Sequence, residues 1–237
     1  MALATEPERE LSLVHQGHQM LRKRIIRGEY PPGTKLKIEA LQQSLRLSSS
    51  PLREALNRLV AEGLVEADEG RGFRAARISR AELTELTDLR VLLETEALRR
   101  SVTQGDDEWE GRVVSAAHKL RLSESRSDGD EGSPIDIDDW ADRHRQFHLA
   151  LLSGSGYPRL LRLCESLFDQ AERYRRIARL SSQPRKKTTE HRKLEEAALS
   201  RDVDKAVELL AAHIRKTGVR VLEVLRESEE LAEINGT

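Results

Sequence analysis

The stretch from Ser48 to Phe73, SSSPLREALNRLVAEGLVEADEGRGF, is the feature that most constrains the fold of this chain. Serine hydroxyls can accept hydrogen bonds from the first free amides of a helix, and Pro51 suits its first turn because it has no amide to leave unpaired. Apolar residues then recur every three or four positions until a glycine follows, where helices commonly stop. The stretch predicts a helix with one buried face and a polar face that carries Arg53, Asn57 and Arg58.

The elements around this helix follow an order typical of one fold. A helix is expected over 11–28, followed by a turn at the glycines and prolines of GEYPPGTKL, a short strand in TKLKI and a second helix near Glu39. Two short strands are expected around Gly70 and Gly72, after the helix that begins at Ser48. This is the order of a winged helix-turn-helix, whose third helix enters the major groove of DNA.

Charge is distributed unevenly along the 237 residues. The formal net charge is only -1, which excludes a uniformly basic surface. Residues 12–77 hold twelve Lys and Arg against seven Asp and Glu, whereas residues 79–237 hold 27 against 31. The polar face of the third helix is therefore either a solvated surface or part of a local basic surface for nucleic acid.

Composition limits the cellular setting and the number of domains. Cys164 is the only cysteine, so an intrachain disulfide is excluded, and no apolar run approaches 18 residues. A cytoplasmic protein of two domains is expected. We assign 1–10 to a flexible arm, 11–78 to the DNA-binding domain, 79–230 to a helical effector-binding and dimerisation domain, and 231–237 to a tail.

The N-terminal third resembles the DNA-binding domain of the GntR family of bacterial transcription regulators. The family pattern is roughly G-x-x-x-P-G-x-x-L, then S-R-x-P-[VL]-R-E-A-L-x-x-L, then E-G-L and R-G, and about 50 residues are in register with it. One departure is Ser49, which replaces an arginine that often follows the first serine of the recognition helix. The resemblance and the helix pattern together give as candidate DNA-contacting residues Lys35, Lys37, Ser48, Ser49, Ser50, Arg53, Asn57, Arg71 and Gly72.

From Ser79 onward almost every segment has a helical pattern, with no credible strand. Six or seven helices predict an antiparallel bundle, so the chain as a whole is expected to be mainly α: an N-terminal winged helix-turn-helix plus a C-terminal all-α antiparallel helical bundle. Four histidines lie in this half. His144 and His148 are one helical turn apart, while His191 and His213 belong to later helices. Taken singly, each is more simply a packed or surface histidine than a metal ligand.

This half resembles the effector-binding domain of the FadR-type branch of GntR regulators. Phe147-His148, Glu190-His191 and His213-Ile214 match its F-H, E-H and H-[IL] motifs. The resemblance implies that three histidines and a carboxylate hold a divalent metal, but here His144 stands in the carboxylate's place. The alternatives are a four-imidazole site suited to zinc or nickel, and a three-histidine site whose fourth ligand is water or effector.

Arg90 and Glu94 match an arginine and a glutamate early in the first helix of that domain. They lie one turn apart, and a surface salt bridge is the simpler interpretation. The resemblance instead implies that Arg90 clamps a carboxylate of the effector, with Arg143 and Tyr174 as candidates for a second anchor. Similarity to repressors of glutarate and 4-aminobutyrate utilisation operons favours a short dicarboxylate.

The sequence thus predicts a ligand-responsive repressor. It would bind a palindromic operator as a homodimer and be released by a small carboxylate. Two alternatives remain. One is a metal-dependent hydrolase in which Glu190 or Glu94 acts as the base. The other is a DNA-binding protein with a purely structural metal and no effector.

Overall fold

The computed structural model describes residues 6–68, 70, 72–125, 136–179 and 189–234. The chain divides into two compact units. One comprises Met1–Ser79 with Arg173–Ile177, and the other comprises Arg80–Glu172 with Ala178–Thr237. Within the described ranges, no helix is both long enough and apolar enough to cross a membrane.

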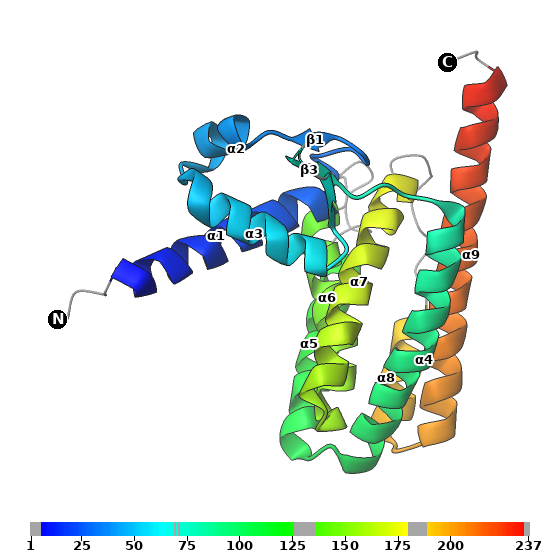
Figure 1. Ribbon diagram of the computed structural model, residues 1–237. Helices are drawn as coiled ribbons and strands as arrows, with labels where there is room; N and C mark the ends of the chain where they lie inside the picture. The colour runs from blue at the N-terminus through cyan, green and yellow to red at the C-terminus, as the bar shows by residue number, and fades with distance from the viewer. Residues whose placement is uncertain (1–5, 69, 71, 126–135, 180–188, 235–237) are drawn as a thin grey trace. The chain divides into compact units, whose positions relative to one another are not determined.

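The N-terminal unit is the expected winged helix-turn-helix (Figure 1). Its elements are α1 (Glu6–Ile26), β1 (Lys35–Leu36), α2 (Ile38–Leu45), α3 (Ser49–Ala61), β2 (Val65–Asp68) and β3 (Gly72–Ala75). The first helix begins at Glu6, within the segment expected to be a flexible arm, and ends two residues before Gly28. Gly28 has a positive φ of 78°, a conformation that glycine adopts readily after a helix.

A small antiparallel sheet forms the wing. Its strand order is β1-β3-β2, with Leu36 opposite Phe73 and Val65 opposite Ala75. These four side chains are buried, because alternate residues of each strand face the helices. The buried side chains of the sheet therefore extend the hydrophobic core of the helices. They also anchor the β2–β3 hairpin next to the end of α3.

The buried face of α3 is the one that the sequence predicts. Leu52, Leu56 and Leu59 are fully buried and pack in one cluster with Leu21 and Ile25 of α1. The start of α3 differs from expectation in one detail. Ser48 occupies the N-cap position with extended backbone, but its side chain makes no capping hydrogen bond.

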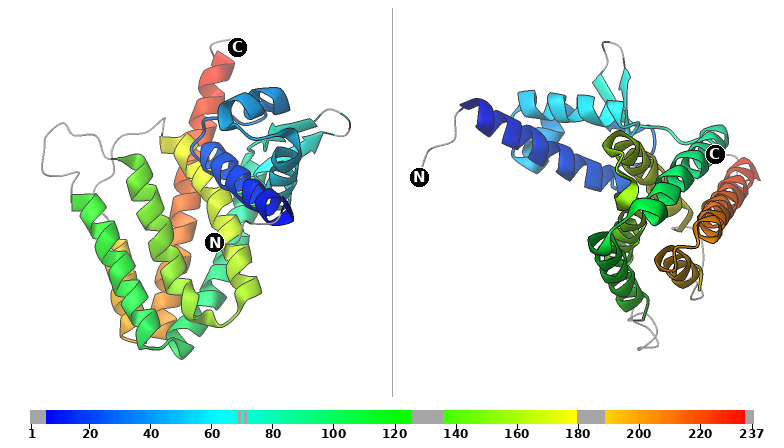
Figure 2. Two further views of the ribbon diagram at one scale, coloured as in Figure 1. Left: turned by 90° about the vertical axis from the view of Figure 1, so that its left-hand side faces the viewer. Right: turned by 90° about the horizontal axis from the view of Figure 1, so that it is seen from below.

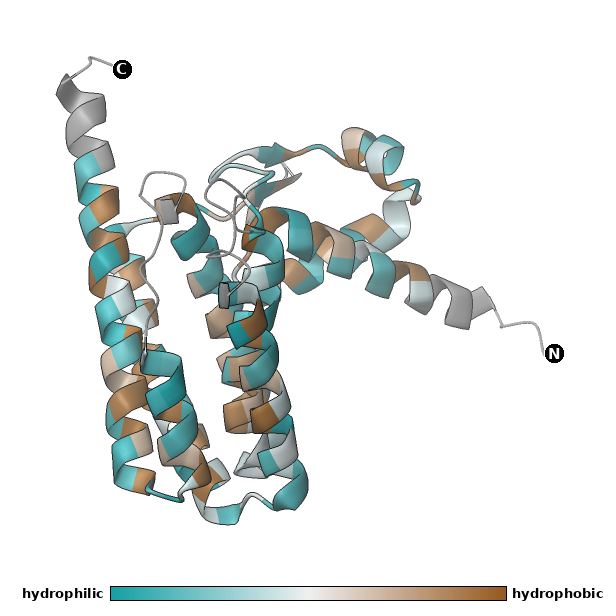
Figure 3. Ribbon diagram, turned by 180° about the vertical axis from the view of Figure 1, so that it is seen from behind, coloured by the Kyte–Doolittle hydropathy of each residue, from teal (hydrophilic) through white to brown (hydrophobic). Residues whose placement is uncertain are grey.

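The second unit is all-helical, as the sequence predicts (Figure 2). Its helices are α4 (Arg80–Gln104), α5 (Asp107–Ser125), α6 (Ile137–Leu152), a 3₁₀ turn (Ser153–Ser155), α7 (Pro158–Arg179, of which Arg173–Ile177 belong to the first unit), α8 (Glu190–Leu199) and α9 (Val203–Ile234). Figure 3 shows that hydrophobic and hydrophilic residues alternate along these helices. The core includes the fully buried Trp109, Phe147 and Leu98.

Two helices of this bundle approach each other closely. A Cβ placed on Gly218 of α9 would lie 2.6 Å from Oγ1 and 2.9 Å from Cγ2 of Thr87 on α4. Thr87 is itself fixed, since its hydroxyl donates to the Leu83 carbonyl at 2.7 Å. Glycine is therefore the residue that lets α4 and α9 pack at this distance.

Candidate functional site

Four histidines meet inside the helical unit. His144 and His148 come from α6, His191 from α8 and His213 from α9, and one ring nitrogen of each lies within 4.8 Å of the others. All four side chains are buried, and Nε2 of His144 and Nε2 of His148 are 3.1 Å apart. The described residues thus contain a group of nitrogen donors with the spacing of a metal centre, built from the four histidines that the sequence singled out.

Aromatic rings hold these imidazoles in place. Trp140 stacks on His144, with ring centroids 4.5 Å apart and an angle of 17° between the rings. Phe147 meets His191 edge to face at 5.6 Å, and Phe168 lies 5.4 Å from His148. Such packing limits rotation of the imidazoles and reduces access of water, which strengthens a coordination bond.

A carboxylate orients His213. Glu190 Oε2 lies 2.9 Å from His213 Nδ1, and Oε1 of the same carboxylate accepts a hydrogen bond from Lys216 Nζ. The hydrogen bond from His213, together with that from Lys216, lowers the pKa of Glu190 to about 2 although partial burial opposes the shift. A proton held on Nδ1 leaves the lone pair of His213 on Nε2, where a metal can take it.

The buried ring nitrogens of His191 test whether the site fits a metal. Its Nε2 is buried and has no hydrogen-bond partner among the described residues, while Nδ1 lies 3.4 Å from Oε1 of Glu124. A buried polar atom without a partner is costly, and a metal ion bound to Nε2 removes that cost. The donor set and this nitrogen therefore fit a divalent metal that prefers imidazole ligands.

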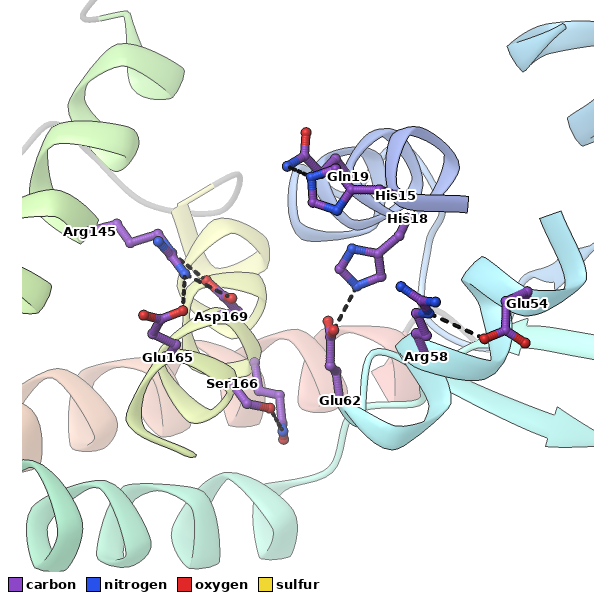
Figure 4. Close-up of polar contacts among 11 residues, drawn as sticks. His15, His18, Gln19, Glu54, Arg58, Glu62, Arg145, Glu165, Ser166 and Asp169 are labelled. Carbon is purple, nitrogen blue, oxygen red and sulfur yellow. Dashed lines mark hydrogen bonds and ion pairs between the residues drawn. The ribbon is translucent and has the colours of Figure 1, made fainter. Parts of the chain in front are cut away.

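The helix that carries His144 and His148 is tied to its neighbour by an ion pair. Arg145 of α6 donates from Nε to Asp169 of α7 at 2.8 Å, and Glu165 lies 3.7 Å away (Figure 4). Burial works against the charge of Arg145, but the hydrogen bond and charge of Asp169 outweigh it and raise the pKa of the guanidinium. This contact fixes α6 against the helix that supplies Phe168.

Arg90 and Glu94 form a buried pair in the same interior. Arg90 Nε lies 2.6 Å from Glu94 Oε1 and Nη2 lies 3.4 Å from Oε2, with side-chain exposures of 6% and 1%. The simpler interpretation, a surface salt bridge, is therefore wrong. The guanidinium also lies 5.1 Å from the centroid of Phe168, the ring that contacts His144 and His148.

The two residues expected as a second anchor engage other partners. Arg143 donates to Asp139 at 2.8 Å and to the Lys119 carbonyl at 2.8 Å. The hydroxyl of Tyr174 lies 3.2 Å from the backbone nitrogen of Ser79. The part of both residues in effector binding stays a prediction.

The candidate DNA-contacting residues lie on the surface of the N-terminal unit. Exposed side chains or backbone are found at Lys35, Lys37, Ser48, Ser49, Ser50, Arg53, Asn57 and Gly72, while Arg71 lies outside the described residues. On α3, Arg58 is paired with Glu54 at 3.3 Å. His18 of α1 contacts Glu62 at 2.6 Å and fixes the far end of α3 (Figure 4).

Sequence reasoning missed the residues that support the histidines. Trp140 and Lys216 had a signal, since they lie four and three residues along a helix from His144 and His213. Glu124 and Phe168 had none, because only the packing of separate helices brings them to the cluster.

Comparisons with known proteins agree with this architecture. Residues 15–74 match the gntR family of bacterial regulatory proteins, and residues 85–216 match the FCD domain. The uncharacterized HTH-type transcriptional regulator BphR of Paraburkholderia xenovorans is 38% identical over 87% of this chain and 84% of its own length. The HTH-type transcriptional repressor GlaR of Escherichia coli is 36% identical over 84% of this chain and 90% of its own length.

Solved structures show the same fold. The structure of E. coli McbR/YncC has a TM-score of 0.75 at 21% identity and covers 89% of this chain and 97% of its own. A GntR regulator from Rhodococcus sp. RHA1 has a TM-score of 0.70 at 21% identity, over 90% of this chain and 98% of its own. By its two domain matches and its relatives, this chain is a member of the GntR family of transcriptional regulators, in the branch that carries an FCD domain.

Proposed function

We propose that this regulator is a repressor that binds a palindromic operator as a homodimer and is released by a small carboxylate. In this proposal residues 11–78 contact DNA, and residues 79–230 bind the effector and pair the protomers. The observation that carries it is the placement of Arg90, whose guanidinium packs on the same Phe168 ring as two of the four clustered histidines. A cation and a metal-binding group thus share one interior, which suits a ligand with negative charge.

Arg90 has capacity for a ligand beyond its partner Glu94. Its hydrogen bonds to described residues run from Nε and Nη2 to Glu94, so Nη1 is left for another acceptor. A buried guanidinium binds a carboxylate oxygen more strongly than an exposed one, because water does not compete. Because Arg90 and two of the histidines contact the same Phe168 ring, we propose that a second carboxylate of the same molecule binds at the histidines and that the effector is a short dicarboxylate.

The metal proposed for the cluster is zinc, with nickel as the second choice. Four imidazoles are neutral ligands that suit both ions. Because they carry no charge, they leave the positive charge of the ion unneutralised. The bound ion would supply a Lewis acid to which a carboxylate oxygen of the effector can coordinate. His144, His148, His191 and His213 would hold it, and Glu190 would keep His213 in the coordinating tautomer.

Effector binding changes DNA affinity only if the effector prefers one arrangement of the dimer over another. We propose that the ligand-bound helical domains favour an arrangement in which the two recognition helices no longer match the two half-sites. The family membership and the relatives named as regulators set aside the hydrolase alternative. A purely structural metal without effector is the alternative that an experiment has to exclude.

A thermal-shift screen tests the proposed effector site. The purified protein, zinc-loaded or chelated, is melted with C4–C6 dicarboxylates and with monocarboxylates of similar length. A ligand that binds only the folded state must raise the melting temperature. At a ligand concentration about a hundred times its Kd, it adds about 2.7 kcal/mol to the free energy of unfolding. We expect a shift with one dicarboxylate that disappears on chelation and in Arg90→Ala. A protein that loses stability on chelation but shifts with no carboxylate would have a structural metal only.

A further inference from the structure

We infer that Arg46, in the turn between α2 and α3, is a further DNA-contacting residue that binds a backbone phosphate beside the start of the recognition helix. The inference rests on the proposed DNA-binding function and adds a contact that the sequence pattern does not single out. It rests on the left-handed backbone of Arg46, on the absence of a hydrogen bond or ion pair between its side chain and the described residues, and on the charge of the surrounding surface.

The backbone of Arg46 is left-handed, with φ 56° and ψ 37°, and its N–H donates to the Gln42 carbonyl at 2.9 Å to end α2. Leu45 and Leu47 on either side are buried in the core. The chain must reverse between two buried leucines, so the residue between them takes this conformation and its side chain points to solvent. Glycine meets that demand without steric cost, whereas arginine does not.

Arg201 is an arginine with the same backbone conformation and with partners inside the chain. It is the other non-glycine residue with positive φ, 61°, in the described parts of the chain. Its guanidinium donates to the Val102 carbonyl at 2.9 Å, the Gly105 carbonyl at 2.8 Å and Glu110 at 2.6 Å. These bonds account for an arginine at that position.

Arg46 has no comparable internal role. Its side chain is exposed and forms no hydrogen bond or ion pair with the described residues. Residues held in unfavourable backbone conformations cluster at functional sites, although these conformations cost stability. The guanidinium of Arg46 is therefore open to a partner outside the chain.

The surroundings of Arg46 favour an anion. The N-cap of α3, Ser48, is two residues away, the first turn of α3 holds no acidic residue, and the start of a helix carries a partial positive charge. Arg46 thus supplies a cation at the start of the recognition helix, where phosphate contacts fix the helix on the duplex.

The test measures DNA binding by fluorescence anisotropy over a range of salt concentrations. The probe is a duplex that the wild-type protein enriches from a random-sequence pool. Arg46→Asn removes the charge but keeps the left-handed backbone, which asparagine tolerates, and Arg46→Lys keeps the charge. Lys23→Gln removes the same charge from an exposed position on α1. Arg46→Gly also removes the charge, and glycine adopts the left-handed backbone conformation without steric cost.

We expect Arg46→Asn and Arg46→Gly to bind roughly tenfold more weakly per protomer near 0.1 M salt, with the salt slope reduced by about one per protomer. Arg46→Lys and Lys23→Gln should stay close to wild type, and thermal melting of Arg46→Gly should not fall below wild type. Wild-type affinity and slope in Arg46→Asn and Arg46→Gly would overturn the inference, as would an equal loss in Lys23→Gln. A wild-type protein that enriches no duplex would overturn the proposed function instead.

Discussion

A substitution of Glu190 tests the proposed metal centre while it leaves the four histidines in place. Glu190→Gln keeps the size of the side chain but weakens its hold on His213 Nδ1 and Lys216. Loss of such an orienting carboxylate typically lowers metal affinity about 10–100-fold. We expect a loss of this size for zinc in competition with a chromophoric chelator.

Glu110→Gln is the matched control, because Glu110 also pairs with a cation, Arg201, but away from the histidines. Its zinc affinity should equal that of wild type. An unchanged zinc affinity in Glu190→Gln would show that Glu190 does not orient His213 for coordination.

The acid dependence of the metal-free protein follows from the same carboxylate. The folded-state pKa of Glu190 is lowered to about 2, below its ordinary value of 4.5. A lowered pKa means that the carboxylate stabilises the fold fully above about pH 4.5, and that this stabilisation is lost as the pH falls toward 2. Denaturant melts of the chelated protein at several pH values should show a shallower loss in Glu190→Gln than in wild type. Identical acid profiles of the two proteins would contradict this assignment.

Cys164 has no expected reactivity although the charges of Arg90 and Glu94 act on its thiol. Burial raises the pKa of its thiol to about 12, so almost no thiolate exists at neutral pH. Native protein should therefore resist iodoacetamide, and label should enter only when the protein is unfolded in urea. Rapid labelling of the native protein at pH 7 would show that the core around Cys164 opens.

At the residue scale, the sequence predicted the residues of the candidate site where a local motif identifies them. The i, i+4 spacing of His144 and His148 places both on one side of α6, and motif resemblance added the later histidines. The local sequence does not show that Arg90 and Glu94 are buried, since their spacing suits an exposed pair equally well. It also gives no indication of Phe168, which reaches both groups only after α7 packs.

At the scale of elements, the contact between α4 and α9 can be tested with a pair of glycines. Gly218→Ala places a Cβ against Thr87, and relief of that overlap should cost about 1–3 kcal/mol of unfolding free energy. Gly111→Ala in α5 meets nothing within 4 Å, so the better helix propensity of alanine should add up to about 1 kcal/mol.

Chemical denaturation of the two variants and wild type measures both effects. The expected result is a change of opposite sign in the two variants. A Gly218→Ala protein as stable as wild type would mean that α4 and α9 can separate slightly without loss, so that their close approach is not required.

The order and type of the elements could be predicted because apolar periodicity and the glycine and proline positions are local properties. The α3 helix was expected from Ser48 to Gly63 and is found over Ser49–Ala61. The first helix was less well bounded, since it starts at Glu6 among acidic residues that have no apolar period. Its early turns therefore resemble a solvated arm in sequence.

At the scale of the whole molecule, the chain joins a GntR-type DNA-binding domain to an FCD domain, for which we propose a ligand site. The sequence predicted this organisation through the basic N-terminal third and the helical remainder, and the domain matches confirm the two domain types. The sequence leaves open how ligand occupancy changes DNA affinity, because that depends on the energies of two arrangements of a dimer.

The central claim is that a carboxylate bound at Arg90 and the metal-loaded histidines releases the protein from DNA. The most direct measurement is anisotropy of the enriched duplex, bound to zinc-loaded protein, while a dicarboxylate that raises the melting temperature is titrated in. The account predicts release of the duplex by the wild-type protein and retention by Arg90→Ala and by chelated protein at the same ligand concentration. A duplex that stays bound at saturating ligand, or equal release from Arg90→Ala, would contradict the account.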